Sequence, residues 1–234
     1  MPDTRRGRGR TEKVPRRVGR PATPVLSRET IARAALELID DVEADGFSLA
    51  ELGKRLGVRP SSFYNHVTGK DDILSGVREL ISDSIDARMF AELPWDEALI
   101  SWARGYRIAF ASHPRAIPLF ATTEVAGAVR TFRMYEQVVT GLERGGWPAG
   151  MVIPTMVAVE SFIMGSALDM LAPPGNFDPG PFSADVPAFT ATVAARDAAA
   201  AGQGCRPAGL AFEVGLVALV DGLRGVLRSL RPER

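Results

Sequence analysis

The chain has 234 residues, 46% of them hydrophobic, and a formal net charge of zero. This is enough for a substantial core, in one large domain or in a small domain joined to a larger one. The single cysteine, Cys205, excludes an intramolecular disulfide and a cysteine-rich zinc site. Residues 1–70 carry 14 Lys/Arg against 9 Asp/Glu, whereas residues 71–234 carry 14 against 19. A basic N-terminal third on an acidic remainder indicates that one end of the protein meets nucleic acid.

Residues 1–24 are rich in arginine, proline and glycine, a composition that predicts a disordered basic arm. Gly19-Arg20-Pro21 matches the core tripeptide of an AT-hook, in which Arg20 would lie in the DNA minor groove. A generic arm that adds salt-dependent phosphate contacts is the alternative. No apolar stretch follows the arginines as in a secretory signal, and the longest uncharged apolar run is too short to span a bilayer. We therefore expect a cytoplasmic protein with no membrane partner.

Residues 25–70 are predicted to form a small helical domain that contains a helix-turn-helix. The first helix begins after Ser27 as its N-cap and ends at Gly46. Its apolar stripe follows the spacing of one helix face and would cover the back of the next two helices: Ile31, Ala34, Ala35, Leu38, Ile39 and Val42.

The helix-turn-helix begins with a capping box, Ser48-Leu49-Ala50-Glu51, which can satisfy free backbone N–H groups at a helix start. Gly57 would end this short helix as a C-cap, and Gly53 would let the second helix cross closely over it. Pro60 suits the first turn of that second helix, residues 60–66. Together these signals are typical of a helix-turn-helix, although a helical hairpin with a polar surface is an alternative.

The second helix would present polar side chains to the DNA major groove, whose base edges carry a readable pattern of donors and acceptors. Phe63 and Val67 are spaced to face inward, and Lys70 follows where lysine and backbone N–H groups could hold a phosphate. The predicted DNA-binding residues are Ser48, Arg59, Ser61, Ser62, Tyr64, Asn65, His66, Lys70 and Arg20.

A larger all-α domain, residues 71–234, is predicted to follow. Its first helix, residues 71–92, would connect it to the DNA-binding domain through one apolar seam. Residues 172–187 are rich in proline and glycine and predict a mobile loop. The remaining helices are expected over residues 95–112, 124–144, 148–171, 188–201 and 208–230.

Helices 148–171 and 208–230 are apolar on most of their faces, which is more than the surface of one bundle requires. We therefore expect a homodimer in which these two helices of each chain form a four-helix interface. The alternative is that both are central helices of a monomeric core.

The second domain carries many large and adaptable side chains, which suit a pocket between helices that holds a small, mostly apolar effector. The predicted ligand-binding residues are Trp102, Tyr106, Phe110, Phe120, Thr123, Tyr135, Met156 and Glu160, with Phe132 and Gln137 as further candidates. Core filling is the alternative for most of them individually. No catalytic motif, metal-ligand spacing or phosphate-binding loop is recognisable, so we expect no enzyme activity, cofactor or metal.

Residues 26–74 resemble the DNA-binding domain of the TetR family of bacterial repressors, through the run from Leu56 to Val67 and through Lys70. In that family, residues similar to Tyr64 and His66 hold the DNA backbone. The larger domain is similar to the regulatory domain of the tetracycline repressors. Four segments carry this similarity: W-D-E-A-L, Y-R-I-A-F-A-S-H-P, L-E-R-G-G-W and A-F-E-V-G-L-V-A-L-V-D-G-L. Those proteins bind magnesium–tetracycline through an asparagine and histidines. Trp102 and Phe120 occupy two of these positions here, so the resemblance implies a more apolar effector.

The sequence thus predicts a ligand-responsive repressor that binds a palindromic double-stranded DNA operator as a dimer in the bacterial nucleoid. Ser61, Ser62 and Asn65 would read bases beside Arg59, and Ser48 and Lys70 would contact phosphates. An effector-independent regulator or activator that uses the basic arm is the first alternative. A small-molecule-binding or enzymatic helical bundle is the second.

Overall fold

The computed structural model describes residues 26–41, 47–173 and 175–230. All regular elements among these residues are helical, which confirms the predicted all-α class. The predicted arm at residues 1–24, Arg20 and the end of the first helix at Val42 and Gly46 lie outside the described residues.

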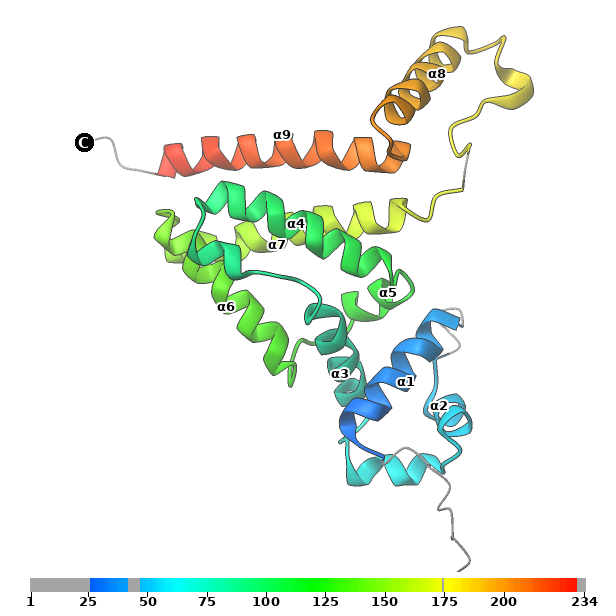
Figure 1. Cartoon of the computed structure of the whole chain (residues 1–234), viewed down its shortest axis with the longest axis vertical. Coiled ribbons are helices and arrows are strands. Elements are labelled where there is room, and N and C mark those ends of the chain that lie inside the picture. The colour runs from blue at the N-terminus through cyan, green and yellow to red at the C-terminus, as the bar shows by residue number, and fades with distance from the viewer. Residues whose placement is uncertain (1–25, 42–46, 174, 231–234) are drawn as a thin grey trace, which may run out of the picture.

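The N-terminal domain lies at one end of the molecule, far from the last helix (Figure 1). It consists of α1 (Arg28–Asp41), α2 (Leu49–Leu56), the 3-10 helix η2 (Pro60–Asn65) and the start of α3 (Lys70–Ser82). The Ser27 hydroxyl accepts a hydrogen bond from the Thr30 N–H at 3.1 Å and caps α1, as predicted. The five α1 stripe residues that the structure describes, from Ile31 to Ile39, are all buried.

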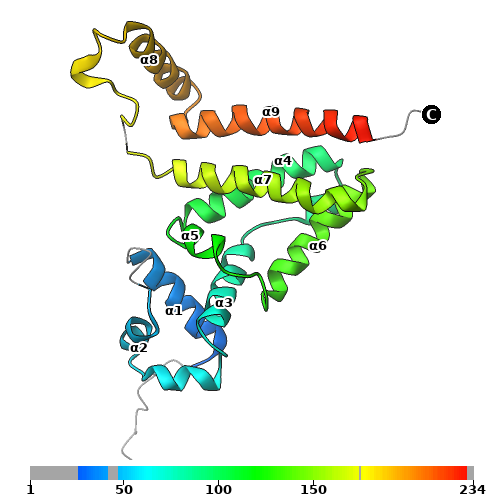
Figure 2. The same cartoon turned by 180° about the vertical axis from the view of Figure 1, so that it is seen from behind.

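The larger domain contains η3 (Arg88–Ala91), α4 (Trp95–Ala111), α5 (Ala116–Ala121), α6 (Val129–Arg144), α7 (Ala149–Asp169), η4 (Gly180–Phe182), α8 (Pro187–Gly202) and α9 (Pro207–Leu230). Helices α7 and α9 run side by side in opposite directions, as both sides of the molecule show (Figures 1 and 2). Helix α8 and the segment before it project from this body. One continuous core runs from α1 to α9, so the two domains share packing through α3.

The predicted connecting helix over residues 71–92 is wrong in length, because α3 ends at Ser82. Short polar side chains supply the alternative bonds that stop it. The Ser84 hydroxyl donates to the Ile81 carbonyl at 2.7 Å, and the Asp86 carboxylate accepts from the Arg88 N–H at 2.9 Å. Ile85 of the predicted seam is still buried, but a turn places it there instead of a helix.

One other helix start and one loop also differ from expectation. Helix α6 begins at Val129 instead of residue 124, because residues 122–128 form a turn in which Gly127 has a φ of 80°. The segment predicted as a loop over residues 172–187 contains η4, and the rings of Phe177 and Phe189 lie 6.3 Å apart. The mobility of this segment stays a prediction.

By length and composition, α7 is apolar enough to cross a membrane, in contrast to the sequence expectation. In this fold it packs against α4, α6 and α9. A core helix of a soluble protein passes the same test of composition.

Candidate DNA interface and effector site

The helix-turn-helix has the local geometry that its residues predict. The Ser48 hydroxyl accepts from the Glu51 N–H at 3.2 Å, and Gly57 ends α2 with a φ of 66°. A Cβ at Gly53 would lie 2.9 Å from the Val58 carbonyl oxygen, so the close crossing requires glycine. The reciprocal half of the capping box differs from expectation, because the Glu51 carboxylate instead accepts from Lys54 Nζ at 2.6 Å.

The second helix of this motif is a 3-10 helix rather than an α-helix. The Ser62 N–H donates to the Arg59 carbonyl at 2.9 Å, and the His66 N–H donates to the Phe63 carbonyl at 2.8 Å. A six-residue element that begins with proline is short enough for this tighter form. Phe63 and Val67 are buried as predicted, so they anchor the element in the core, where η2 contacts α2.

Most of the predicted DNA-binding side chains are exposed to solvent. Tyr64 is the most exposed aromatic residue of this domain, with 61% of its surface accessible. Ser62 is half-buried, and the other described members of the set are exposed: Ser48, Arg59, Ser61, Asn65, His66 and Lys70. Lys70 Nζ lies 5.2 Å from the centre of the Phe47 ring, at the start of α3. These polar and basic residues lie on η2 and at the starts of α2 and α3. These elements lie at the end of the molecule opposite α9 (Figure 2).

The predicted effector residues form a closed aromatic cluster between α4, α5, α6 and α7. The ring centres of Trp102 and Tyr106 are 5.1 Å apart, those of Tyr106 and Phe110 are 4.8 Å apart, and those of Phe110 and Phe120 are 6.0 Å apart. These four side chains and Met156 are buried, and Thr123 and Tyr135 are half-buried. By contrast, Phe132 and Gln137 are exposed on α6, so the structure places them outside the cluster.

One carboxyl group lies at the centre of this cluster. The Tyr106 hydroxyl donates to Glu160 Oε1 at 3.0 Å, and Tyr135 is a second hydrogen-bonding partner. Burial raises the pKa of the Glu160 carboxyl, while the hydrogen bonds from both tyrosines act in the opposite direction. Burial and the neighbouring Glu160 charge raise the pKa values of Tyr106 and Tyr135. The phenols are therefore donors to Glu160 at neutral pH.

Glu160→Gln is expected to become progressively more stable than the unaltered protein as the pH rises. A carboxyl group whose pKa is raised on folding binds more protons folded than unfolded, so its burial destabilises the protein as pH rises through that window. Melting temperatures of both proteins at pH 5 and pH 8 test this. A difference between them that does not change with pH would contradict it.

Sequence reasoning missed a buried arginine beside this cluster. Arg78 of α3 is buried, and its Nη2 donates to the carbonyls of Phe120 and Thr123, each at 3.1 Å. Its guanidinium carbon lies 4.5 Å from the centre of the Phe120 ring. The neighbouring Glu79 faces α1 and α6 instead. Only the apolar periodicity of α3 was visible in the sequence, and it does not indicate which polar neighbours become buried.

Glu79 joins the DNA-binding domain to the larger domain. Its carboxylate accepts from Arg28 of α1 at 2.8 Å and from the Arg130 N–H of α6 at 2.9 Å. Burial acts to raise the pKa of Glu79, but these bonds outweigh it and lower that pKa. A second contact lies at the other end of α1, where Asp40 Oδ2 is 2.8 Å from Nδ1 of His113. His113 belongs to the turn between α4 and α5.

A family comparison agrees with this arrangement of helices. The family model described as "Tetracyclin repressor-like, C-terminal domain" matches residues 92–227. The chain belongs to the TetR family of transcriptional regulators. This confirms the family resemblance of the sequence.

TetR-family relatives extend the likeness over both domains. The tetracycline repressor protein class A from transposon 1721 of Escherichia coli is 29% identical over 214 residues, 89% of this chain and 97% of the relative. A possible TetR family regulator from Streptomyces coelicolor A3(2) is 26% identical, with a TM-score of 0.63 over 86% of this chain and all of that one. ActR of S. coelicolor, solved with actinorhodin, is 19% identical with a TM-score of 0.66, over 86% of this chain and 98% of that one, and shows the fold alone.

Trp102 and Phe120, which the sequence resemblance places at magnesium–tetracycline positions, are part of the apolar core of this TetR-family chain. Trp102 and Phe120 are both buried among aromatic side chains. Within the described ranges, no group of three or more His, Cys, Asp or Glu side chains could hold a metal ion.

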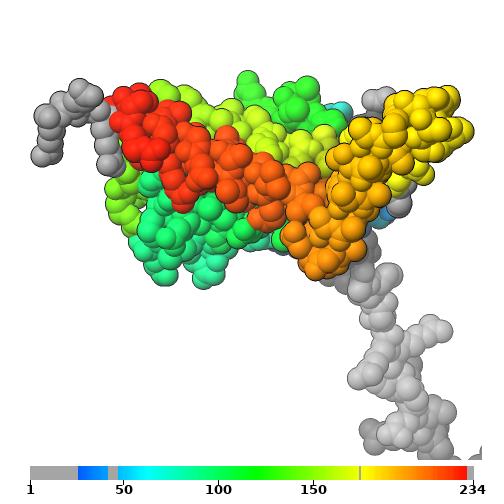
Figure 3. Space-filling view, turned by 90° about the horizontal axis from the view of Figure 1, so that it is seen from above, coloured from blue at the N-terminus to red at the C-terminus, as the bar shows by residue number. Residues whose placement is uncertain are grey.

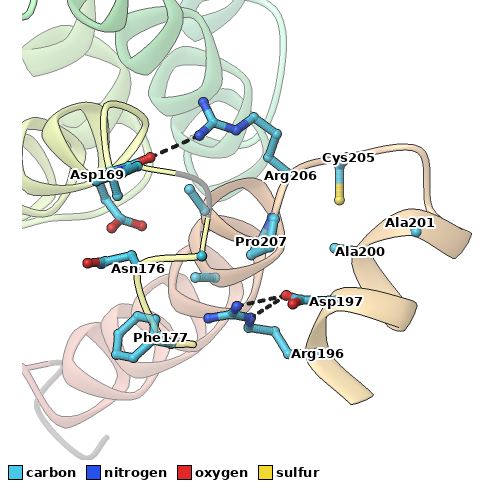
Figure 4. Close-up of a pocket in the computed structure, with 15 residues that line it drawn as sticks. Asp169, Asn176, Phe177, Arg196, Asp197, Ala200, Ala201, Cys205, Arg206 and Pro207 are labelled. Atoms are coloured by element: carbon cyan, nitrogen blue, oxygen red, sulfur yellow. Dashed lines mark hydrogen bonds and ion pairs between the residues drawn. The ribbon is translucent and has the colours of Figure 1, made fainter. Parts of the chain in front are cut away.

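A cavity of about 470 Å³ lies elsewhere, where the end of α7, α8 and the start of α9 meet (Figure 4). The side chains of Asp169, Asn176, Phe177 and Cys205 line it. Arg206 supports one wall by donating to the Ala172 carbonyl at 3.0 Å. Of the predicted ligand-binding residues, none lines this cavity.

Proposed function

We propose that this TetR-family regulator is a repressor that binds a near-palindromic DNA operator as a homodimer and is released by a small, mostly apolar effector. The observation that carries the proposal is the anchored helix-turn-helix with its exposed polar face, joined through α3 to a buried aromatic cluster. Two copies of η2 would enter successive major grooves about 34–36 Å apart. Tyr64, His66, Ser48 and Lys70 would hold the backbone, and Ser61, Ser62, Asn65 and Arg59 would read base edges.

The surface of α7 and α9 supports the homodimer. Helix α9 forms a long ridge that α7 flanks (Figure 3), and apolar side chains remain exposed on both helices. On α7 these include Ile153, Val157 and Leu168, and on α9 they include Val214, Val217 and Val226. Exposed apolar residues in one contiguous region are typical of an interaction surface.

Replacing both Val214 and Val217 with glutamate is expected to convert a dimer of about twice the 25.1 kDa chain mass into monomers. Four carboxylates would then face each other in an apolar interface, where unpaired charge is strongly unfavourable. Sedimentation velocity at micromolar concentration measures the change. Phe132→Glu on α6 is the control, because it adds a charge at an equally exposed apolar site outside the surface. A monomeric unaltered chain would contradict the homodimer.

Effector binding would act through differential affinity for two conformations. The α4–α5 turn contacts α1 through His113 and Asp40, and α3 contacts both domains, so a shift of α5 or α3 changes the position of η2. The spacing of the two η2 elements in the dimer would then no longer fit the operator.

The experiment that tests this function is affinity selection from random-sequence duplex DNA. The full chain is compared with Tyr64→Ala and with a chain that lacks residues 1–24. An inverted repeat recovered by the full chain supports the operator-binding function. Weak binding without sequence preference, dependent on residues 1–24, would instead favour a regulator that uses the basic arm without an effector.

A further inference from the structure

Arg78 is a buried cation without a direct ionic partner. Only 6% of its surface is exposed, and no ion pair joins it to a carboxylate of the described residues. Its hydrogen bonds go from one nitrogen, Nη2, to two backbone carbonyls, and its buried Nε has no acceptor. A buried guanidinium is strongly unfavourable unless its charge and its N–H groups are matched.

Glu160 is a carboxyl group that interacts with this charge, but its carboxylate accepts hydrogen bonds from other donors. Arg78 acts to lower the pKa of Glu160 through its charge, yet burial outweighs this effect and leaves that pKa raised. The Glu160 carboxylate accepts hydrogen bonds from Tyr106 and Tyr135. Arg78 therefore keeps unused hydrogen-bonding capacity in an apolar, aromatic surrounding.

The two carbonyls that Arg78 binds belong to Phe120, near the end of α5, and to Thr123, in the turn that follows. Thr123 is half-buried, and Thr122 and Glu124 on either side of it are exposed. A second α3 side chain, Ser75, donates to the Ala126 carbonyl of the same turn at 2.6 Å. Arg78 thus ties the end of α5 and the turn that follows it to α3, beside the aromatic cluster.

We propose that the effector is an aromatic organic acid whose anionic oxygens bind the Arg78 guanidinium, with its ring body among Phe110, Phe120 and Tyr106. A planar guanidinium presents two parallel N–H groups to a carboxylate, which is stronger than its bonds to neutral carbonyls. Aromatic rings stack favourably in such a cluster. This inference rests on the proposed effector-controlled function and names the chemistry of its ligand.

Binding of the acid at Arg78 releases the Phe120 and Thr123 carbonyls and frees α5 to move. Helix α5 packs against α1, and the turn before it contains His113 and Arg115, which both contact Asp40 of α1. Displacement of α5 is therefore transmitted directly to the DNA-binding domain. Arg78 therefore has two roles: it binds the ligand, and without ligand it holds α5 in position.

Three probes with the same ring system and different charge test the ligand class: 1-naphthoate, 1-naphthamide and 1-naphthylmethylammonium. We expect 1-naphthoate to raise the melting temperature of the full chain most and the ammonium compound least. The dissociation constant for 1-naphthoate should rise at least tenfold in Arg78→Met and less in Arg78→Lys. Arg107→Met is the matched control, because Arg107 is also buried and lies 4.4 Å from a ring centre, but that ring is Phe212 of α9.

The comparison of the three probes on the unaltered chain does not depend on the folding of any variant. Preference for the ammonium compound or the amide, or no shift with any probe, would overturn the acid ligand. If another compound then releases the protein from DNA, only the acid ligand is wrong, and the proposed repressor function still holds. Conversely, 1-naphthoate that binds through Arg78 without changing affinity for the selected duplex would support the ligand class and contradict effector control.

Discussion

Tyr64→Ala should bind the selected operator duplex about 100-fold more weakly than the unaltered chain, with no change in melting temperature. A hydrogen bond to a charged phosphate contributes about 1.5–3 kcal/mol, and a dimer loses it twice. Each 1.4 kcal/mol corresponds to about a tenfold change in affinity. The side chain is largely exposed, so its loss removes little packing within the protein.

Fluorescence anisotropy with the selected duplex and with a scrambled duplex measures this effect. Tyr64→Phe removes only the hydroxyl and separates the hydrogen bond from ring contacts. If Tyr64→Ala binds the selected duplex as tightly as the unaltered chain, then η2 does not hold the DNA as we propose.

Glu79→Ala should destabilise the protein by about 3 kcal/mol, the lower end of the cost of breaking a buried charge pair. The substitution removes the acceptor of Arg28 Nη1 and of the Arg130 N–H together, while Arg28 Nε keeps its bond to Asp72. Since Arg28 is partly exposed, water compensates some of its loss. Urea unfolding measures the change. Glu29→Ala is the control, because its ion pair with Arg33 is exposed on both sides and contributes little.

The same carboxyl group predicts a pH dependence. A carboxyl whose pKa is lowered on folding stabilises the protein above its unfolded pKa of about 4.3, and this contribution is lost as the pH falls through the lower folded value. Glu79→Gln should therefore lose less stability than the unaltered chain between pH 5 and pH 3. Equal losses in the two proteins would show that Glu79 is not part of the acid response.

Local signals in the sequence predicted the helix-turn-helix because its geometry depends on near neighbours. The Ser48 cap, the left-handed Gly57 and the close approach at Gly53 each involve residues within a few positions along the chain. The bounds of α4, α7, α8 and α9 agree with expectation to within two residues for the same reason, since proline, glycine and apolar periodicity mark them directly.

Periodicity failed where side-chain hydrogen bonds compete with the helix. Ile81, Ile85 and Met89 have helical spacing, yet Ser84 and Asp86 bond to the backbone and end α3 near Ser82. The late start of α6 has a different cause. The turn at residues 122–128 is held by Ser75 and Arg78, whose bonds span 51 and 45 positions of the chain.

By itself, the sequence determined the all-α class, the DNA-binding motif and the family, because these follow from local chemistry and from motif spacing. The tertiary structure alone decided which polar residues become buried and what they contact. Arg78 and Glu79 are adjacent in the chain, but α3 directs one to the aromatic cluster and the other to α1 and α6. That difference arises from the packing of α3 between two domains, which no pattern along the chain contains.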